Sequence, residues 1–190
     1  MTRLLFAAGL VLATSPAAWA VGASSAMQAF FDANISGWID EPVLIDAIVL
    51  QNETTARYDG PTIEAMDKAW RDELGAPASP TIDPVLTHPA SDFLRARVAA
   101  SGGTVTEIFV MDSVGLNVAS SGMTSDYWQG DEEKFSQTFG EGAGAMHFSE
   151  IEFDESSQTY QAQISFTLTD PESGAPIGAM TVGIDAEALM

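Results

Sequence analysis

The sequence predicts an α+β domain in which helices pack on one face of an antiparallel sheet. Residues 21–102 carry apolar side chains at helical steps of three and four, whereas residues 103–190 alternate apolar and polar side chains between turn residues. Because the helical runs all precede the strand runs, the two kinds of element are segregated, which is typical of α+β proteins. We therefore expect a single domain, residues 21–190, with a helical part followed by a sheet part.

The first twenty residues have the features of a secretory signal peptide. Arg3 provides a positive charge, residues 4–12 form a short apolar run, and Ala18 and Ala20 are the small residues expected before a cleavage site. The apolar run is too short to span a bilayer, which needs roughly 20 apolar residues, and no later segment comes close to that length. We expect cleavage after Ala20 and export to the periplasm, with no transmembrane segment in the mature chain.

The charge of the chain excludes two classes of partner. The sequence has 27 acidic and 7 basic residues, a formal net charge of −20 at pH 7. Nucleic acids and anionic membrane surfaces are bound through clusters of Lys and Arg, so we expect neither as a partner. The chain also has no cysteine, so its stability depends on packing, which fits a bacterial periplasm better than a disulfide-linked secreted scaffold.

The helical part begins with a long amphipathic stretch. Residues 27–39 repeat apolar side chains at helical spacing, and residues 43–58 continue the pattern after a break at Pro42. This pattern predicts one long helix or two helices in line.

A second helix is expected between Pro61, which suits a first helical position, and Gly75, which suits a stop. Its apolar stripe contains Trp70. We expect ion pairs on its flanks at i, i+4 spacing, namely Glu64 with Lys68 and Asp67 with Arg71. A proline-rich connector follows, and Ser91 is expected to cap a last helix that ends at Gly102.

Five strands are expected in the sheet part, joined mostly by tight hairpins. Their ranges are 105–112, 115–121, 143–155, 159–170 and 175–185. The fourth alternates strictly, with Tyr160, Ala162, Ile164, Phe166 and Leu168 on an apolar face and glutamines, serine and threonine on a polar face.

One long connection interrupts the strands, residues 121–142, which we call the excursion. We expect it to cover the face of the sheet that the helices leave open. A connection of this length inside a compact domain is uncommon unless it is functional.

Tests for catalytic and metal chemistry are negative. The two histidines, His88 and His147, lie near no recognisable nucleophile motif, and the chain has no cysteine. The acidic runs 131–133 and 152–155 lack the alternating spacing of a calcium loop. We expect no enzyme, no metal site and no cofactor. A pair of carboxylates that hydrolyses glycosides is not excluded by the sequence, because acidic residues are abundant along the chain.

Aromatic and cationic residues are few, so their positions carry more information. The excursion places Tyr127 and Trp128 side by side, and in an extended backbone Tyr127 and Gln129 point one way and Trp128 the other. These aromatics either fold back onto the core from a surface turn or form one wall of a small-molecule pocket. Asp131 either caps the following helix or reaches a ligand.

The second helix offers two further candidates. Trp70 lies on the apolar stripe, so it either packs in the core or lines a pocket. Arg71 lies at the border between that stripe and solvent. It either pairs with Asp67 at the surface or bends inward to bind a carboxylate.

Three segments resemble a known family. "VTEIFVMDSVGLNVASS", "TSDYWQGDEEKF" and "IEFDESSQTYQAQISFTLTDPESGAPIGAMTVGID" resemble the single Cache domains, extracytoplasmic PAS-like sensor domains of bacterial signalling proteins. The resemblance extends from about residue 27 to the end of the sequence. It implies a long N-terminal helix packed on a five-stranded antiparallel sheet, with a small metabolite such as an organic acid or amino acid bound between sheet and excursion.

The resemblance also implies a set of site residues. Tyr127, Trp128, Gln129 and Asp131 are ligand-binding candidates, joined by Tyr160 from the fourth strand. Amino-acid-binding relatives have an Arg and a Trp after the pocket Tyr, and this chain departs from that pattern at residues 129–131. A cation for the ligand would then come from the second helix, where Arg71 adjoins Trp70.

The expected function is that of a periplasmic sensor domain that passes ligand occupancy to a separate membrane partner, a histidine kinase or a chemoreceptor. Cache domains usually lie between two membrane helices, whereas this sequence ends directly after its last strand, so we expect a stand-alone module. The alternative is a non-catalytic interaction subunit of an envelope complex with a degenerate pocket.

Overall fold

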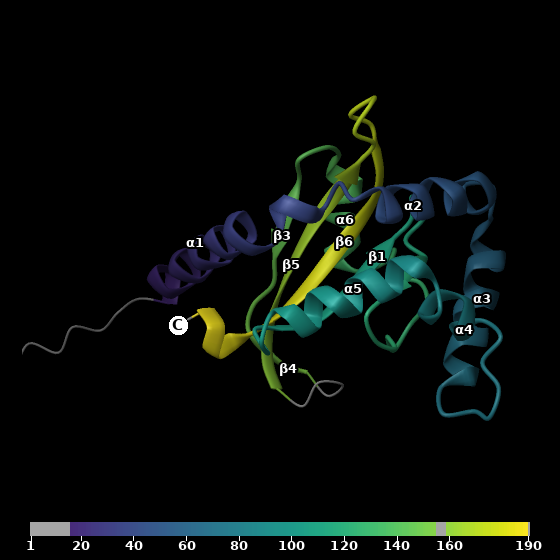
Figure 1. Cartoon of the computed structure of the whole chain (residues 1–190), viewed down its shortest axis with the longest axis horizontal. Helices are drawn as coiled ribbons and strands as arrows, with labels where there is room; N and C mark the ends of the chain where they lie inside the picture. The colour runs from purple at the N-terminus through teal and green to yellow at the C-terminus, as the bar shows by residue number, and fades with distance from the viewer. Residues whose placement is uncertain (1–15, 155–158, 190) are drawn as a thin grey trace, which may run out of the picture.

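Helices pack on one face of an antiparallel sheet, which confirms the α+β prediction (Figure 1). The computed structural model describes residues 16–154 and 159–189. Within these residues, six strands follow the order β2 (Asn117–Ser120), β1 (Val105–Met111), β6 (Pro176–Asp185), β5 (Thr159–Thr169) and β3 (Met146–Phe148), and β4 (Glu152–Asp154) also pairs with β5.

The prediction of five strands is wrong because the expected third strand is two strands, β3 and β4. Both pair with β5, but the ladder is interrupted between them at residues 149–151. The hydroxyl of Ser149 accepts the backbone N–H of Gln163 at 2.8 Å, a position that a backbone carbonyl would fill in a continuous ladder. The same hydroxyl donates to the carbonyl of Glu150, so the backbone after Ser149 leaves the sheet before it rejoins.

The helical part contains α1 (Pro16–Asn34), the 3-10 turn η1 (Ser36–Trp38), α2 (Pro42–Thr55), α3 (Gly60–Glu73), α4 (Ile82–Leu86) and α5 (Pro89–Ala100). The expected N-terminal stretch is therefore two helices. They separate at η1 and Pro42, because proline in the first turn of α2 lacks the N–H that a continuous helix would need. The expected signal peptide lies largely outside the described residues, and cleavage after Ala20 stays a prediction.

The boundaries of α3 follow the sequence signals. The Asp59 carboxylate accepts the backbone N–H of Thr62, Pro61 lies in the first turn, and Gly75 has a φ of 74° directly after the helix ends. The expected pair of Arg71 with Asp67 is present. The expected partner of Lys68 is wrong, since Lys68 pairs with Asp72, one turn in the other direction.

Ser91 is not the cap of α5, contrary to prediction. His88 caps this helix through Nδ1, which accepts the backbone N–H of Ala90 at 3.1 Å. Ser91 is buried, and its hydroxyl donates to the carbonyl of Val85 and accepts the N–H of Ser120. A residue with typical capping chemistry thus joins α4, α5 and β2.

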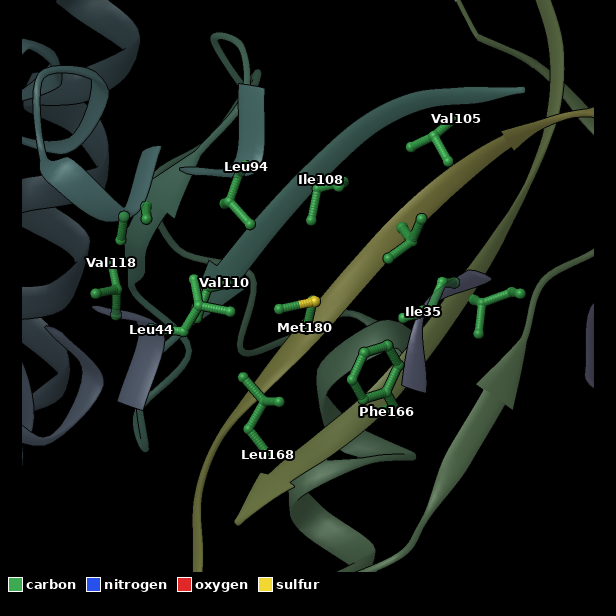
Figure 2. Close-up of a cluster of buried hydrophobic side chains, with 14 of the residues drawn as sticks. Ile35, Leu44, Leu94, Val105, Ile108, Val110, Val118, Phe166, Leu168 and Met180 are labelled. Carbon is green, nitrogen blue, oxygen red and sulfur yellow. The ribbon is translucent and has the colours of Figure 1, made fainter. Parts of the chain in front are cut away.

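The main core lies between the helices and one face of the sheet (Figure 2). Leu44 of α2 and Leu94 of α5 face Ile108, Val110 and strand β6 beneath them. Further main-core side chains are contributed by α1, β2, β5 and β6, and include Met27, Val118, Ala162, Ile164, Phe166, Leu168, Met180 and Val182.

The second face of the sheet is covered in part by the excursion, as predicted. The excursion contains α6 (Glu133–Ser136) and the 3-10 turn η2 (Phe139–Glu141). Phe135 packs with Phe109 and Met111 of β1, and Phe139 packs against the same cluster. The polar face of β5 is therefore largely buried rather than solvated; Ser165, for example, hydrogen-bonds to Thr181 of β6.

Candidate functional site

The first half of the excursion is attached to α3 through a buried carboxylate. Asp67 is 5 % exposed, and its Oδ1 accepts the backbone N–H groups of Tyr127 and Trp128 at 3.0 and 3.1 Å. Its Oδ2 lies 2.7 Å from Arg71, which also reaches Asp126 of the excursion at 3.2 Å. Arg71 thus secures the excursion from outside and already has two carboxylate partners.

Trp70 and Tyr127 form the centre of a second apolar cluster. Their rings stack with centroids 5.2 Å apart and planes inclined by 9°. The indole N–H of Trp70 donates to the carbonyl of Thr124 at 2.8 Å, and Leu116, Ile82 and Val85 complete the buried cluster. The contact joins residues that lie 57 positions apart, so α3 and the excursion form one packed unit.

Trp128 and Gln129 lie between this cluster and the rest of the excursion. Trp128 is half-buried, and its indole N–H donates to the carbonyl of Val114 at 2.8 Å. The backbone N–H of Gln129 donates to the carbonyl of Gly115, which extends the antiparallel pairing beyond β2. Gln129 itself is buried, donating to the carbonyl of Asp126 and lying 3.4 Å from Lys134.

Two glycines allow the backbones to approach at this point. Gly115 has a φ of 88°, and a Cβ placed there would lie 2.6 Å from the Cα of Gly130. A Cβ on Gly130 would lie 2.3 Å from Nε1 of Trp128. The turn between β1 and β2 therefore packs directly on residues 128–130 and leaves no room for a side chain at either glycine.

The second half of the excursion borders a polar cavity of about 690 Å³. Residues 131–134 line one side. Gln161 and Gln163 of β5, with His147 and Ser149, line the other side. Beneath them, the Glu107 carboxylate accepts hydrogen bonds from both glutamine amides, which fixes the orientation of the two side chains.

The lining of this polar cavity is strongly acidic. Carboxylates come from Asp131, Glu132, Glu133, Glu150 and Glu152. Among the lining residues Lys134 is the single Lys or Arg; its Nζ lies 2.9 Å from Glu132 and 5.4 Å from the ring centre of Phe109. The electrostatic potential inside the cavity is therefore negative.

The structure separates the residues that the sequence predicted as one site. Trp70 and Tyr127 lie together on the helical side of the excursion, and Asp131 lines the polar cavity. Asp131 is not the N-cap of α6, since Glu132 occupies that position without a side-chain capping bond. Tyr160 is 63 % exposed and does not line the polar cavity, although its ring contacts Phe153, which lies at the edge of that lining.

Sequence reasoning singled out only Asp131 among the residues that line this cavity, and the residues that it missed include Gln161, Gln163 and His147. The signal for the glutamines was present in the strict alternation of the fourth expected strand, whose polar face had to lie under the excursion. His147 pairs in register with Ser165 and so lies on the same face. Its Nδ1 lies 3.1 Å from Oε1 of Gln137, and its Nε2 lies 3.8 Å from Glu133.

Two further properties concern the part of the chain that the structure describes, residues 16–154 and 159–189. It contains no group of three or more His, Asp or Glu side chains arranged to hold a metal ion. None of its helices is both long and apolar enough to cross a bilayer.

Comparison with known proteins places the fold. No family model and no curated protein matches the sequence. Among solved structures, the sensor domain of the V. cholerae histidine kinase DctB is similar over 91 % of this chain and 55 % of its own, with 15 % identity and a TM-score of 0.50. The isoleucine-bound sensory domain of the Campylobacter jejuni chemoreceptor Tlp3 is similar over 89 % of this chain and 64 % of its own, with 11 % identity and a TM-score of 0.41.

The chain thus spans about half to two thirds of the length of these solved structures. At these identities the likeness describes the fold alone, and the chain shares its arrangement of helices on an antiparallel sheet with the DctB sensor domain.

Proposed function

We propose that this chain is a ligand-sensing domain of the Cache type that binds a small molecule in the polar cavity. The observation that carries the proposal is the position of that cavity, between the polar face of β5 and residues 131–134 of the excursion. The fold shared with the DctB sensor domain supports the same assignment. The domain would be exported, would not be catalytic, and would pass ligand occupancy to a separate membrane histidine kinase or chemoreceptor.

The charge of the lining favours a ligand with a protonated amine. Asp131, Glu150 and Glu152 supply negative charge at the cavity, and an organic dianion would be repelled by it. The amide groups of Gln161 and Gln163 offer hydrogen bonds to neutral parts of a ligand. Amines and amino acids therefore fit the lining better than organic acids, with Lys134 as the group that would meet a ligand carboxylate.

Occupancy would be transmitted through the second half of the excursion. α6 follows the lining residues directly, and Phe135 packs on β1, so a ligand that moves residues 131–134 also changes the packing of α6 on the sheet. The extent of this shift is limited by the difference in the ligand's affinity for the two arrangements.

A thermal-shift screen of the exported domain with amines, amino acids, organic acids and purines tests the proposal. A ligand present at 100 times its dissociation constant stabilises the protein by about 2.7 kcal/mol, which raises the melting temperature measurably. We expect hits among amines, and we expect Asp131→Asn to weaken them at least threefold.

The matched control is Glu53→Gln, which removes the same charge from an exposed position of α2 outside the cavity lining. If no amine or amino acid changes the melting temperature, or if Glu53→Gln weakens a hit as much as Asp131→Asn does, the assignment of this cavity is wrong.

An interaction subunit with a degenerate pocket is the second candidate, and an exposed apolar pair favours it. Phe153 of β4 and Tyr160 of β5 are 50 % and 63 % exposed and pack edge to face with centroids 5.4 Å apart. Co-purification of a stable partner that Phe153→Ser releases, without any ligand response, would support this candidate over a sensor.

A further inference from the structure

We infer that the chain has a second binding site, for an uncharged and largely apolar small molecule, in a cavity between α2, α4 and β2. The cavity measures about 460 Å³, within the size range of small-molecule sites. It lies on the helical side of the excursion, whereas the polar cavity lies on the other face of the sheet. The inference does not depend on the proposed function.

The lining of this apolar cavity determines the chemical class of its occupant. Leu50, Met66, Val85 and Val118 supply apolar surface, and Tyr58 adds an aromatic ring. None of the lining residues is Asp, Glu, Lys or Arg. Besides the tyrosine hydroxyls, the polar groups of the lining are those of Gln51, His88 and three threonines, none of which is a carboxylate, ammonium or guanidinium group. An ion would lose hydration here without gaining an opposite charge from such a group, so the lining favours an uncharged ligand.

The hydroxyl of Tyr127 indicates that an occupant brings a hydrogen-bond acceptor. Tyr127 is only 6 % exposed and lines the cavity, yet its Oη makes no hydrogen bond within the described part of the chain. The oxygen is not fully enclosed by protein atoms, so it is open to the cavity and available to an occupant. Burial, with the nearby Asp112 carboxylate and Tyr58, raises the pKa of Tyr127 above its ordinary value, so the group stays a donor.

The surroundings of Tyr127 hold this donor in place. Its ring stacks on Trp70 and its backbone N–H is bound by Asp67, so the hydroxyl is oriented before any ligand arrives. A fixed donor loses less conformational entropy on binding than a mobile one. At the cavity mouth Leu50 is 65 % exposed, and an apolar occupant would cover part of its side chain.

A fluorescence titration with Prodan, an uncharged naphthyl ketone, tests the inference. Prodan emission shifts to the blue in an apolar site, and its ketone oxygen can accept from Tyr127. We expect saturable binding with a blue shift, and we expect Tyr127→Phe, which keeps the ring but removes the hydroxyl, to raise Kd about five- to tenfold.

A second variant closes the mouth without touching the core. Thr54 is exposed on α2 and lines the cavity, so Thr54→Trp should abolish saturable binding. Glu53→Trp, at the neighbouring exposed position outside the lining, is the matched control and should leave Kd unchanged. Near-UV circular dichroism checks that each variant is folded. If Tyr127→Phe is not folded, the binding measurement on Thr54→Trp tests the inference alone.

Four results would overturn the inference. The first is Prodan emission that does not saturate, and the second is a Kd that neither Tyr127→Phe nor Thr54→Trp changes. The third is loss of binding in Phe153→Ser, which would place the probe on the exposed apolar pair or in the polar cavity that Phe153 also lines. The fourth is a mass doubling in light scattering that Thr54→Trp reverses, which would make a second copy the occupant. A negative amine screen leaves this test unaffected, so the two proposals fail separately.

Discussion

Residues 121–130 and residues 131–142 belong to one excursion but are attached to the domain by different contacts. The first half is held by buried polar contacts, with Asp67 binding two backbone N–H groups and Trp70 binding the carbonyl of Thr124. The second half is held mainly by Phe135 and Phe139 against the sheet, while its charged side chains are half-buried or exposed.

This difference separates a fixed part from a movable part. Hydrogen bonds to buried groups are lost at full cost when the backbone moves, whereas a few apolar contacts on a flat surface allow small displacements. We interpret the first half as the support of the apolar cavity and the second half as the mobile wall of the polar cavity. Three predictions test this interpretation, from the largest expected effect to the smallest.

Two carboxylates provide the first test, because Asp67 binds the first half and Glu132 belongs to the second. Asp67→Ala should lower the free energy of unfolding by about 2 to 3 kcal/mol, because it leaves two backbone N–H groups of the excursion without an acceptor. Glu132→Ala breaks the pair with Lys134, but the Glu132 carboxylate is far more exposed than that of Asp67, so stability should change by less than about 0.5 kcal/mol. Urea unfolding measures both values; equal losses would contradict the division into fixed and movable halves.

Two glycines with positive φ provide the second test. Gly115→Ala adds backbone strain and a contact at 2.6 Å with Gly130, so we expect a loss of about 2 kcal/mol. Gly144 lies just beyond the second half with a φ of 80° and nothing within 4 Å of an added Cβ, so Gly144→Ala should cost about 1 kcal/mol from strain alone. Thermal melts of both variants check the order, and a larger loss at Gly144 would show that close packing at residues 128–130 is unimportant.

The third test asks whether the fixed region extends to the far end of α3. Glu73 accepts hydrogen bonds from the hydroxyl and N–H of Thr81 and the N–H of Ile82. Partial desolvation raises the pKa of Glu73, but these hydrogen bonds outweigh it and the pKa lies below its ordinary value of 4.5. The ionised form is therefore favoured in the folded state, and its stabilising effect is present above pH 4.5 and lost as the pH falls through the lowered pKa.

Glu73→Gln should accordingly lower the melting temperature slightly at pH 6, and the difference from the parent should vanish once the pH has fallen through the lowered pKa of Glu73. Glu64→Gln, at an exposed position of the same helix, should show no such convergence. A constant difference at every pH would mean that the charge of Glu73 does not hold the loop between α3 and α4.

Local sequence patterns predicted most of the fold. The alternation of β5, the proline and glycine limits of α3 and the hairpin of β1 and β2 are short-range signals, and the structure follows them. The division of β3 from β4 was not predictable, because the side chain of Ser149 replaces a backbone acceptor only once β5 lies beside it. Ser91 was assigned to a cap for a similar reason, since its partners Val85 and Ser120 are brought to it by the tertiary structure.

The candidate site was less accessible to sequence reasoning. Composition singled out Tyr127 and Trp70 separately, but their stacking depends on a contact between distant segments that no periodicity describes. The acidic residues of the polar cavity were too abundant along the chain to be informative, and only the fold selects Asp131, Glu150 and Glu152 from among them. Their roles as ligand contacts stay predictions.

The Asp67 carboxylate has a consequence for isotope exchange. The amide hydrogens of Tyr127 and Trp128 share one buried oxygen, so both exchange with deuterated water only when the excursion detaches from α3. The exchange rates of these two neighbouring amides therefore both report how often the excursion detaches. A molecule that binds in the apolar cavity should slow the exchange of both amides, because it stabilises the first half of the excursion. A molecule that binds in the polar cavity and moves only the second half should leave both exchange rates unchanged.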